Sequence, residues 1–170
     1  VGWSELPWDE FRRQRPTQAI LFRVAAKASA YYNFGFADDR VYLTLDGHRF
    51  DDFATYAFVS NDRGKTWKSL TEDLPAREPS YAILEDPRNE NLLFLGTEYG
   101  CHVSLDRGQR WFALGRGLPT VAVRDLFLQD RDSDLIAATH GRGVWVLDIE
   151  ALRQMTAAIA KSPANLFAPE

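Results

Sequence analysis

The sequence predicts an all-β fold of about three consecutive four-stranded units, and three observations carry this prediction. An octapeptide of the form Ser-x-Asp-x-Gly-x-x-Trp occupies residues 60–67 and recurs at residues 104–111, 44 positions later. Residues 91–106 align with residues 133–148 at an offset of 42. With 45% apolar and 13% aromatic residues, the composition suits a β-rich globular protein. Repetition at such intervals is typical of an array of supersecondary units.

The repeated octapeptide has the residue types of a tight turn between two strands. Its Asp carboxylate can accept hydrogen bonds from N–H groups of its own turn. The glycine two positions later supplies a positive φ, which a side chain would make costly. The closing tryptophan offers a large apolar face to a neighbouring unit and an N–H group that needs a partner. We therefore assign structural roles to Ser60, Asp62, Gly64, Trp67, Ser104, Asp106, Gly108 and Trp111.

The octapeptides resemble the Asp-box, or BNR, repeat of sialidases, sortilin-like ectodomains and bacterial "glycosyl hydrolase BNR repeat" proteins, which are β-propellers. The run Thr-His-Gly-Arg-Gly-Val-Trp-Val-Leu-Asp at 139–148, with Leu-Arg-Gln at 152–154, looks like the closing segment of the bacterial sortilin-like group. Residues 46–53 resemble an insertion of that group. The resemblance covers about residues 40–167 and is specific for fold rather than for reaction.

The resemblance implies an all-β partial β-propeller of about three four-stranded Asp-box blades, with a short C-terminal helix. It also implies a place outside the cytoplasm, periplasmic or secreted. The family label implies glycan-directed hydrolysis.

Composition and charge exclude several classes of function. The net charge of −4 gives no footprint for nucleic acid, and no basic run suggests an anionic membrane surface. The single Cys101 excludes an internal disulfide. No stretch approaches the roughly 20 apolar residues of a membrane span, and residues 1–15 carry no signal peptide. We expect no cofactor, no metal, no nucleic-acid partner and no membrane span.

The length of 170 residues conflicts with a closed ring. A blade takes about 40–45 residues, and a closed propeller typically needs about 4–8 blades. The chain is therefore expected to be the C-terminal part of a larger propeller, or to complete a ring with another polypeptide. Its expected partners are a protein or the remaining blades, with a glycan as a further candidate.

The repeats divide the chain into five parts. Residues 1–17 are the end of a preceding blade or a linker, since Trp3-Ser4-Glu5-Leu6-Pro7 resembles the fourth strand and exit turn at 111–119. The remaining parts are a blade with a long rim loop at 18–75, a blade at 76–119, a closing blade without its own fourth strand at 120–148, and a helix and tail at 149–170.

Individual strands follow from the apolar runs. The first blade is expected to have a strand within 18–30, where a helix is the alternative, then a loop at 31–36, strands at 41–45 and 56–60, and a loop at 46–55. The later blades are expected to have strands at 80–85, 122–128, 135–138 and 144–147. A short amphipathic helix with Asp148 as N-cap is expected to run through Ile149, Leu152 and Ile159 and to stop at Pro163.

In such a meander, the loops between second and third strands meet at one rim, and the octapeptide turns lie on the other face. Asp62 and Asp106 are therefore not an acid/base pair. Converging rim loops on a rigid scaffold are where sites are usually built. The candidate ligand-binding residues at this rim are Asp46, His48, Arg49, Asp51, Asp52, Glu98, Tyr99, His140 and Arg142.

The rim residues leave two functions open. They form a polar set that can bind a sugar, an anion or a metal, although exposed loop charges are usually solvated or locally paired. The alternative is a glycan hydrolase that uses rim carboxylates, such as Asp46, Asp51, Asp52 or Glu98. Nothing marks Arg49, Arg142 and Tyr99 as a sialidase set, residues 46–52 lack calcium-loop spacing, and Cys101, His102 and Met155 fit packing. No residue pair has a catalytic signature, so we favour a non-catalytic binding or scaffold module.

Overall fold

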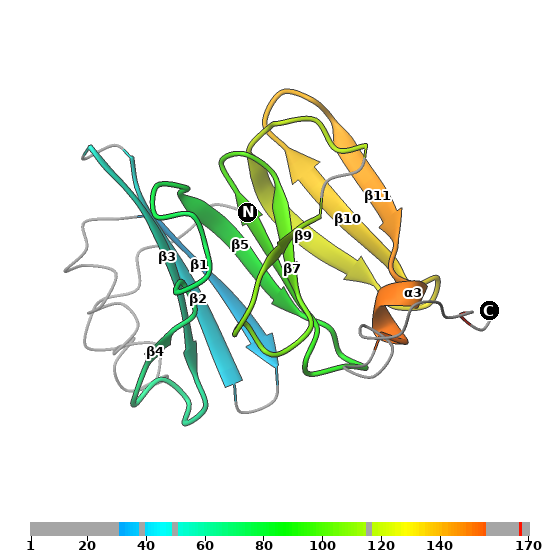
Figure 1. Ribbon diagram of the computed structural model, residues 1–170, viewed down its shortest axis with the longest axis horizontal. Helices are drawn as coiled ribbons and strands as arrows, with labels where there is room; N and C mark the ends of the chain where they lie inside the picture. The colour runs from blue at the N-terminus through cyan, green and yellow to red at the C-terminus, as the bar shows by residue number, and fades with distance from the viewer. Residues whose placement is uncertain (1–30, 38–39, 49–50, 115–116, 156–166, 168–170) are drawn as a thin grey trace, which may run out of the picture.

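The computed structural model describes residues 31–37, 40–48, 51–114, 117–155 and 167. They form three antiparallel sheets that stand side by side along the chain (Figure 1). The first sheet has the order β1 (Tyr31–Ala37), β2 (Arg40–Gly47), β3 (Asp52–Ser60) and β4 (Lys68–Ser69). The expected strand within 18–30 and the expected blade end or linker at 1–17 lie outside the described residues.

The second sheet repeats this order, and the third stops one strand earlier. The second consists of β5 (Ser80–Glu85), β6 (Leu93–Thr97), β7 (Cys101–Ser104) and β8 (Phe112–Ala113). In the third, β9 (Val123–Gln129), β10 (Asp134–Thr139) and β11 (Val144–Asp148) have the order β11-β10-β9. Among the described residues, β11 therefore pairs with β10 alone.

Two expectations for the first sheet are wrong. Residues 31–36 belong to strand β1, not to a loop, and pair with β2 from Tyr31 opposite Asp46 to Ala37 opposite Arg40. Four of these residues are aromatic, a type that strands favour. The loop expected at 46–55 is also shorter, because β2 runs to Gly47 and β3 begins at Asp52.

The C-terminal helix is short within the described residues. Helix α3 covers Glu150–Arg153 with Ile149 at the N-cap position, so Asp148 is not the N-cap. Asp148 still accepts a hydrogen bond from the Glu150 N–H, at 2.8 Å. Ile149, at the N-cap position, is fully buried, and its side chain packs into the core. The expected continuation to Ile159 and Pro163 lies outside the described residues.

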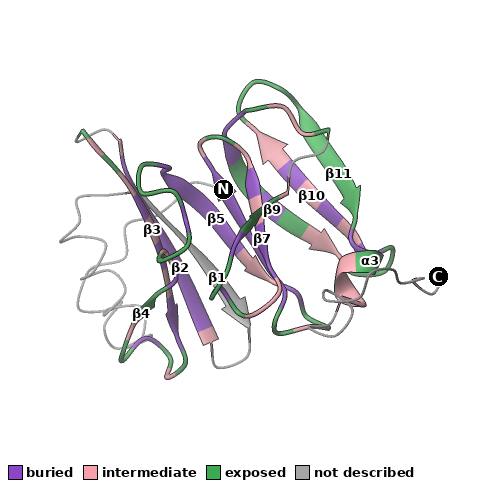
Figure 2. Cartoon of the chain, viewed as in Figure 1, coloured by how far each residue is buried: buried purple, intermediate pink, exposed green. Residues whose placement is uncertain are grey.

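The core consists of apolar layers between neighbouring sheets. Tyr42 and Val59 of the first sheet cluster with Leu93 and Leu95 of the second. The other face of the second sheet packs against the third, where Phe94 belongs to the same cluster as Val123, Leu126 and Leu135. Figure 2 shows β5 of the middle sheet mostly buried, whereas β11, in the third sheet, is exposed.

One glycine permits the close packing of the second and third sheets. A Cβ atom placed on Gly96 of β6 would lie 2.7 Å from the carbonyl oxygen of Val123 on β9. Real Cβ atoms do not come this close to backbone, so residue 96 must be glycine for β9 to approach β6.

Candidate functional site

The turns between second and third strands lie at one end of the molecule, which we call the rim. Figure 1 shows the β2–β3, β6–β7 and β10–β11 turns at the upper end and α3 at the opposite end. Among the described residues, the rim comprises 46–48, 51–52, 78–81, 97–102, 122–124 and 139–143. Since antiparallel order repeats from sheet to sheet, side chains from all three sheets meet here.

Asp46 is a buried carboxylate at the end of β2, with a side chain only 6% exposed. Its two oxygens lie 2.7 and 2.6 Å from Nδ1 of His48, and Oδ1 also accepts the His48 N–H at 3.0 Å. A guanidinium nitrogen of Arg124, on the third sheet, lies 4.0 Å from Oδ2. The negative charge of Asp46 is thus stabilised by the His48 N–H of its own turn and by the Arg124 guanidinium of the third sheet.

Arg124 is the centre of the rim cluster. Its guanidinium carbon lies 3.7 Å from the ring centre of Tyr81, a cation–π contact. A second guanidinium nitrogen lies 3.8 Å from Oε2 of Glu98, which accepts the Tyr81 hydroxyl. Burial and this hydrogen bond raise the pKa of Tyr81. We call Asp46, His48, Tyr81, Glu98 and Arg124 the rim cluster.

The rim cluster combines engaged carboxylates with a partly exposed guanidinium. Both carboxylates have cationic or hydroxyl partners within the protein. The Arg124 side chain is 39% exposed, so part of its fork of N–H donors faces solvent. Such a fork, fixed over an aromatic ring, is prepared to donate hydrogen bonds to a carboxylate, carbonyl or hydroxyl oxygen of a ligand.

A second buried carboxylate, Glu78, lies beside the cluster. Its Oε1 accepts the Thr97 hydroxyl and lies 2.9 Å from Nε2 of His102. Its N–H donates to the hydroxyl of Thr55 at 3.0 Å. His102 therefore has a polar partner besides the strand packing that the sequence indicates. The arrangement joins β3, β6 and β7 and is structural.

The other predicted rim residues do not join the cluster. Asp52 accepts hydrogen bonds from the Tyr56 hydroxyl at 2.9 Å and the Ala54 N–H at 3.0 Å. Asp51, at a positive φ of 59°, is exposed, and so are Tyr99, His140 and Arg142. The Asp51 N–H donates to the His48 carbonyl oxygen at 3.3 Å, but within the described part of the chain no side chain of these five makes a hydrogen bond or ion pair to the cluster. Arg49 lies outside the described residues.

The first octapeptide turn is held by its own side chains. The Ser60 hydroxyl accepts the Gly64 N–H at 2.6 Å and donates to Oδ1 of Asp62 at 2.8 Å. The same Oδ1 accepts the N–H groups of Lys65 and Thr66 at 3.0 and 2.8 Å. These hydrogen bonds, led by that from the Thr66 hydroxyl, lower the pKa of Asp62 to about 2.

The second octapeptide turn has the same pattern of hydrogen bonds. Ser104 accepts the Gly108 N–H at 2.7 Å and donates to Asp106 at 2.9 Å, and Asp106 accepts the Arg110 N–H at 2.8 Å. Both glycines have positive φ, 86° for Gly64 and 79° for Gly108. The geometry at both turns is that of a backbone support.

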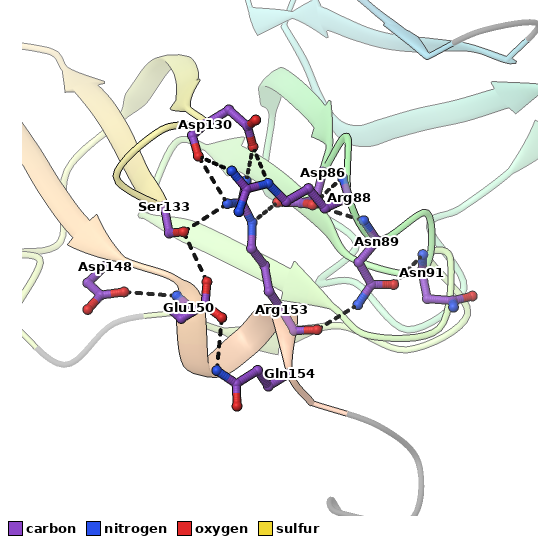
Figure 3. A network of polar contacts seen from close by, with 10 residues as sticks. All are labelled: Asp86, Arg88, Asn89, Asn91, Asp130, Ser133, Asp148, Glu150, Arg153 and Gln154. Atoms are coloured by element: carbon purple, nitrogen blue, oxygen red, sulfur yellow. Dashed lines mark hydrogen bonds and ion pairs between the residues drawn. The ribbon is translucent and has the colours of Figure 1, made fainter. Parts of the chain in front are cut away.

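A buried ion pair fixes α3 to the end opposite the rim (Figure 3). Nε of Arg153 donates to Oδ2 of Asp86 at 2.7 Å, and the two side chains are 5% and 0% exposed. The other guanidinium nitrogens donate to Asp130 and Ser133, each at 2.9 Å. Because Asp86 follows β5 and Asp130 follows β9, Arg153 joins the helix to two sheets.

Among the described residues, no group of three or more His, Cys, Asp or Glu side chains is arranged to hold a metal ion. In the described part of the chain, no helix has the length and apolar character needed to cross a membrane.

Comparison with known proteins identifies the fold. No family model matches the chain, and no curated protein matches it. Among solved structures, it is similar to the GH74 xyloglucanase from Xanthomonas campestris, with a TM-score of 0.56 and 16% identity over 68% of this chain and 20% of that one. The described sheets are part of a β-propeller.

Two further structures agree. The Niastella koreensis GH74 enzyme matches with a TM-score of 0.53 and 14% identity over 68% of this chain and 20% of its own. YCF48, solved bound to D1 peptide, matches with a TM-score of 0.52 and 17% identity over 70% of this chain and 38% of its own. This chain therefore spans only a minor part of each of these similar structures. Identities this low show the fold alone.

Sequence reasoning missed Arg124, Tyr81 and Arg153 as side chains that join blades. Arg124 carries the one signal that was readable, because it is a charged residue within an apolar strand run, at the rim end of its strand. Tyr81 gave no such signal, since an aromatic residue in a strand is ordinary packing. The partner of Arg153, Asp86, is 67 residues away in sequence.

Proposed function

We propose that this chain is a non-catalytic binding or scaffold module of a larger propeller or complex, which engages a protein or glycan through its rim and its open blade edge. The observation that carries the proposal is the outer face of the third blade. All five residues of β11 are exposed, including Val144 and Val146 at 66% and 61%. Phe127 of β9, opposite Ile136, is 61% exposed as well.

These residues form one apolar row across the sheet. Phe127 and Val146 are both register partners of Ile136, so their side chains lie on one face. The equivalent row of the second blade contains Phe94 and Val103, which are buried against the third blade. An exposed apolar face beside an unpaired strand edge is typical of a protein-binding surface.

The rim cluster supports binding over hydrolysis. A glycosidase needs one carboxylate free to act as acid and a second as base or nucleophile. Asp46 is engaged by His48 and Arg124, and Glu98 by Tyr81 and Arg124. The exposed donors of Arg124 suit recognition of a carbonyl, carboxylate or sugar hydroxyl at the rim.

The proposal includes assignments that the sequence suggested. The octapeptide turns are Asp boxes, supported by their shared pattern of hydrogen bonds. Blades correspond to residues 18–75, 76–119 and 120–148, preceded by a blade end or linker at 1–17 and followed by the helix and tail at 149–170. The protein acts outside the cytoplasm, as its resemblance to sortilin-like propellers implies.

The test is the mass of the native particle, measured by light scattering, with mass spectrometry of every polypeptide in it. We expect additional blades or a second polypeptide, and a lower mass for the Phe127→Asp variant. Phe112→Asp is the matched control, because Phe112 is 54% exposed on a fourth strand. A single monodisperse chain with no companion would contradict the proposal.

The hydrolase alternative is tested separately. Two of the similar structures are GH74 enzymes, one a xyloglucanase, so xyloglucan is the first substrate to incubate with the native particle. We expect no release of reducing ends. Release that disappears in Glu98→Gln would overturn the non-catalytic assignment.

A further inference from the structure

An apolar groove of about 360 Å³ lies between the second and third blades. Its walls include Cys101, Leu114 and Leu118 of the second blade, and Leu135, Ala137 and Trp145 of the third. These residues come from strands β7, β10 and β11 and from the end of the segment that carries β8. The groove opens beside the unpaired edge of β11.

The groove has an occupied counterpart one blade earlier. The residues equivalent to Cys101, Leu114, Leu118, Leu135 and Ala137 are Ala57, Leu70, Leu74, Leu93 and Leu95, by register and repeat offset. There, all five belong to one buried cluster with Trp111. The Trp111 indole is 7% exposed, and its Nε1–H donates to the carbonyl oxygen of Leu70 at 2.9 Å.

The groove is open because, within the described ranges, the third blade lacks the strand that would fill it. Trp111 directly precedes the fourth strand β8, and Trp67 directly precedes β4. Both fourth-strand segments read Trp-x-x-Leu: 67–70 and 111–114. Among the described residues, no such segment follows β11, so no indole occupies the space between Leu114 and Leu135.

The edge of β11 has the hydrogen-bond groups that such a strand needs. In the first two blades, the leucine that ends the pattern donates its N–H to Ala57 or Cys101, at 2.9 and 2.8 Å. The residue equivalent to these acceptors is Val144. Thr139 donates to the Gly143 carbonyl, so in the alternating ladder Val144 and Val146 turn their N–H and C=O groups to the open edge.

We propose that the β11 edge and this groove bind an extended Trp-x-x-Leu strand of a partner polypeptide. The first central residue pairs with Val146 and the second with Trp145, as Phe112 pairs with Val103 and Ala113 with His102. The indole enters the groove and donates to the Leu114 carbonyl, and the leucine N–H donates to Val144. This inference rests on the proposed binding function and names the class of partner.

A head-to-tail second copy does not fit this face. At an interface between two blades, the later blade packs an apolar face against the earlier one, as Leu93 and Leu95 of the second blade pack against the first. A second copy of the chain would have to offer the same face of its own first blade. The equivalent face of the first blade is already buried, since Leu43 and Leu45 are 0% and 2% exposed. Another segment with the pattern, Trp3-Ser4-Glu5-Leu6, lies outside the described residues, and the experiment below separates it from a partner strand.

The probe is a fluorescent peptide with the sequence of residues 64–72, titrated into the full chain and followed by fluorescence anisotropy. We expect saturable binding that weakens by about tenfold or more when the peptide carries Trp67→Ala, since a buried indole is a typical energetic anchor. Val146→Pro in the chain removes an N–H from the open edge without removing a bond to β10, and is expected to weaken binding by about tenfold as well. Val146→Thr, which keeps the N–H and the branched shape, is the control and is expected to bind within about twofold of the wild type.

Two results would overturn the binding of any Trp-x-x-Leu strand at this edge. One is binding that does not change with Trp67→Ala in the peptide or with Val146→Pro, in variants whose thermal unfolding matches the wild type. The other is absence of binding both in the wild type and in a Trp3→Ala chain. Binding that appears only in Trp3→Ala would overturn the partner as occupant in favour of the chain's own segment. If the native particle contains further polypeptides but the peptide does not bind, the inference fails while the proposed function stands.

Discussion

The interface between the first and second blades is closed, whereas that between the second and third is open at its outer end. In the first, Trp111 lies among Leu70, Leu74 and Leu93 and seals the space between the sheets. In the second, the equivalent space is the groove beside β11. The second and third sheets have the same order through their first three strands, so the fourth strand, which the third sheet lacks among the described residues, accounts for the difference.

Each interface also has an ion pair, and the two pairs are placed differently. At the first, Arg40 donates to both oxygens of Glu85, at 2.9 and 2.5 Å, and the Tyr42 hydroxyl donates to the same carboxylate at 2.5 Å. At the second, Asp86 receives Arg153 from helix α3, which follows the last strand. The comparison teaches that a fourth strand seals one interface, while the C-terminal helix fastens the other.

The largest expected effect is the loss of the sealing indole. Trp111→Ala is expected to lower the free energy of unfolding by about 3–5 kcal/mol, because it leaves a cavity and an unpaired Leu70 carbonyl. Urea denaturation measures the change. The neighbouring Phe112→Ala, at an exposed position, is expected to stay within about 0.5 kcal/mol of the wild type. Equal costs for the two variants would mean that the first interface is not sealed by Trp111.

The second prediction concerns the fastening helix. Arg153→Met leaves Asp86 as a buried carboxylate without its cation, and is expected to cost about 3 kcal/mol by urea denaturation. Arg131→Met removes a surface guanidinium that is 83% exposed and paired only locally with Asp132, so its cost should not exceed about 0.5 kcal/mol. If Arg153→Met proves as mild as the control, the helix does not hold the second interface.

The smallest expected effect is confined to acid. The folded-state pKa of Asp62 is lowered to about 2, below the roughly 3.9 of an unfolded Asp. Its contribution is therefore fully present above the unfolded pKa and is lost as the pH falls through the folded pKa. Between about pH 4 and pH 2, the unfolding free energy of Asp62→Asn should fall less steeply than that of the wild type. Parallel slopes in urea denaturation at several pH values would contradict this.

The repeat allowed much of the fold to be predicted. Two octapeptides 44 residues apart indicate two equivalent units, and a β-propeller is what the similar structures show. The strands at 80–85, 122–128 and 144–147 were predictable because turn residues bound each apolar run. Strand β1 was not, because Asn33 and Gly35 within it are residue types that strands disfavour.

The rim cluster was predictable only in part. Topology alone places Asp46, His48 and Glu98 at one rim, and the structure joins them through Arg124. The contacts of Arg124 join residues up to 78 positions apart, from Asp46 to Arg124, and periodicity carries no information on such pairs. Whether these residues bind a ligand stays a prediction.

The middle blade differs from the last blade in having both of its faces covered. Every residue of β6 is buried, whereas every residue of β11 is exposed. In an array whose units contact mainly their neighbours, local opening begins where a unit has one neighbour instead of two. The last blade is therefore where local unfolding is expected to begin. Binding of a strand at its edge would oppose this local unfolding and lengthen the lifetime of the folded chain.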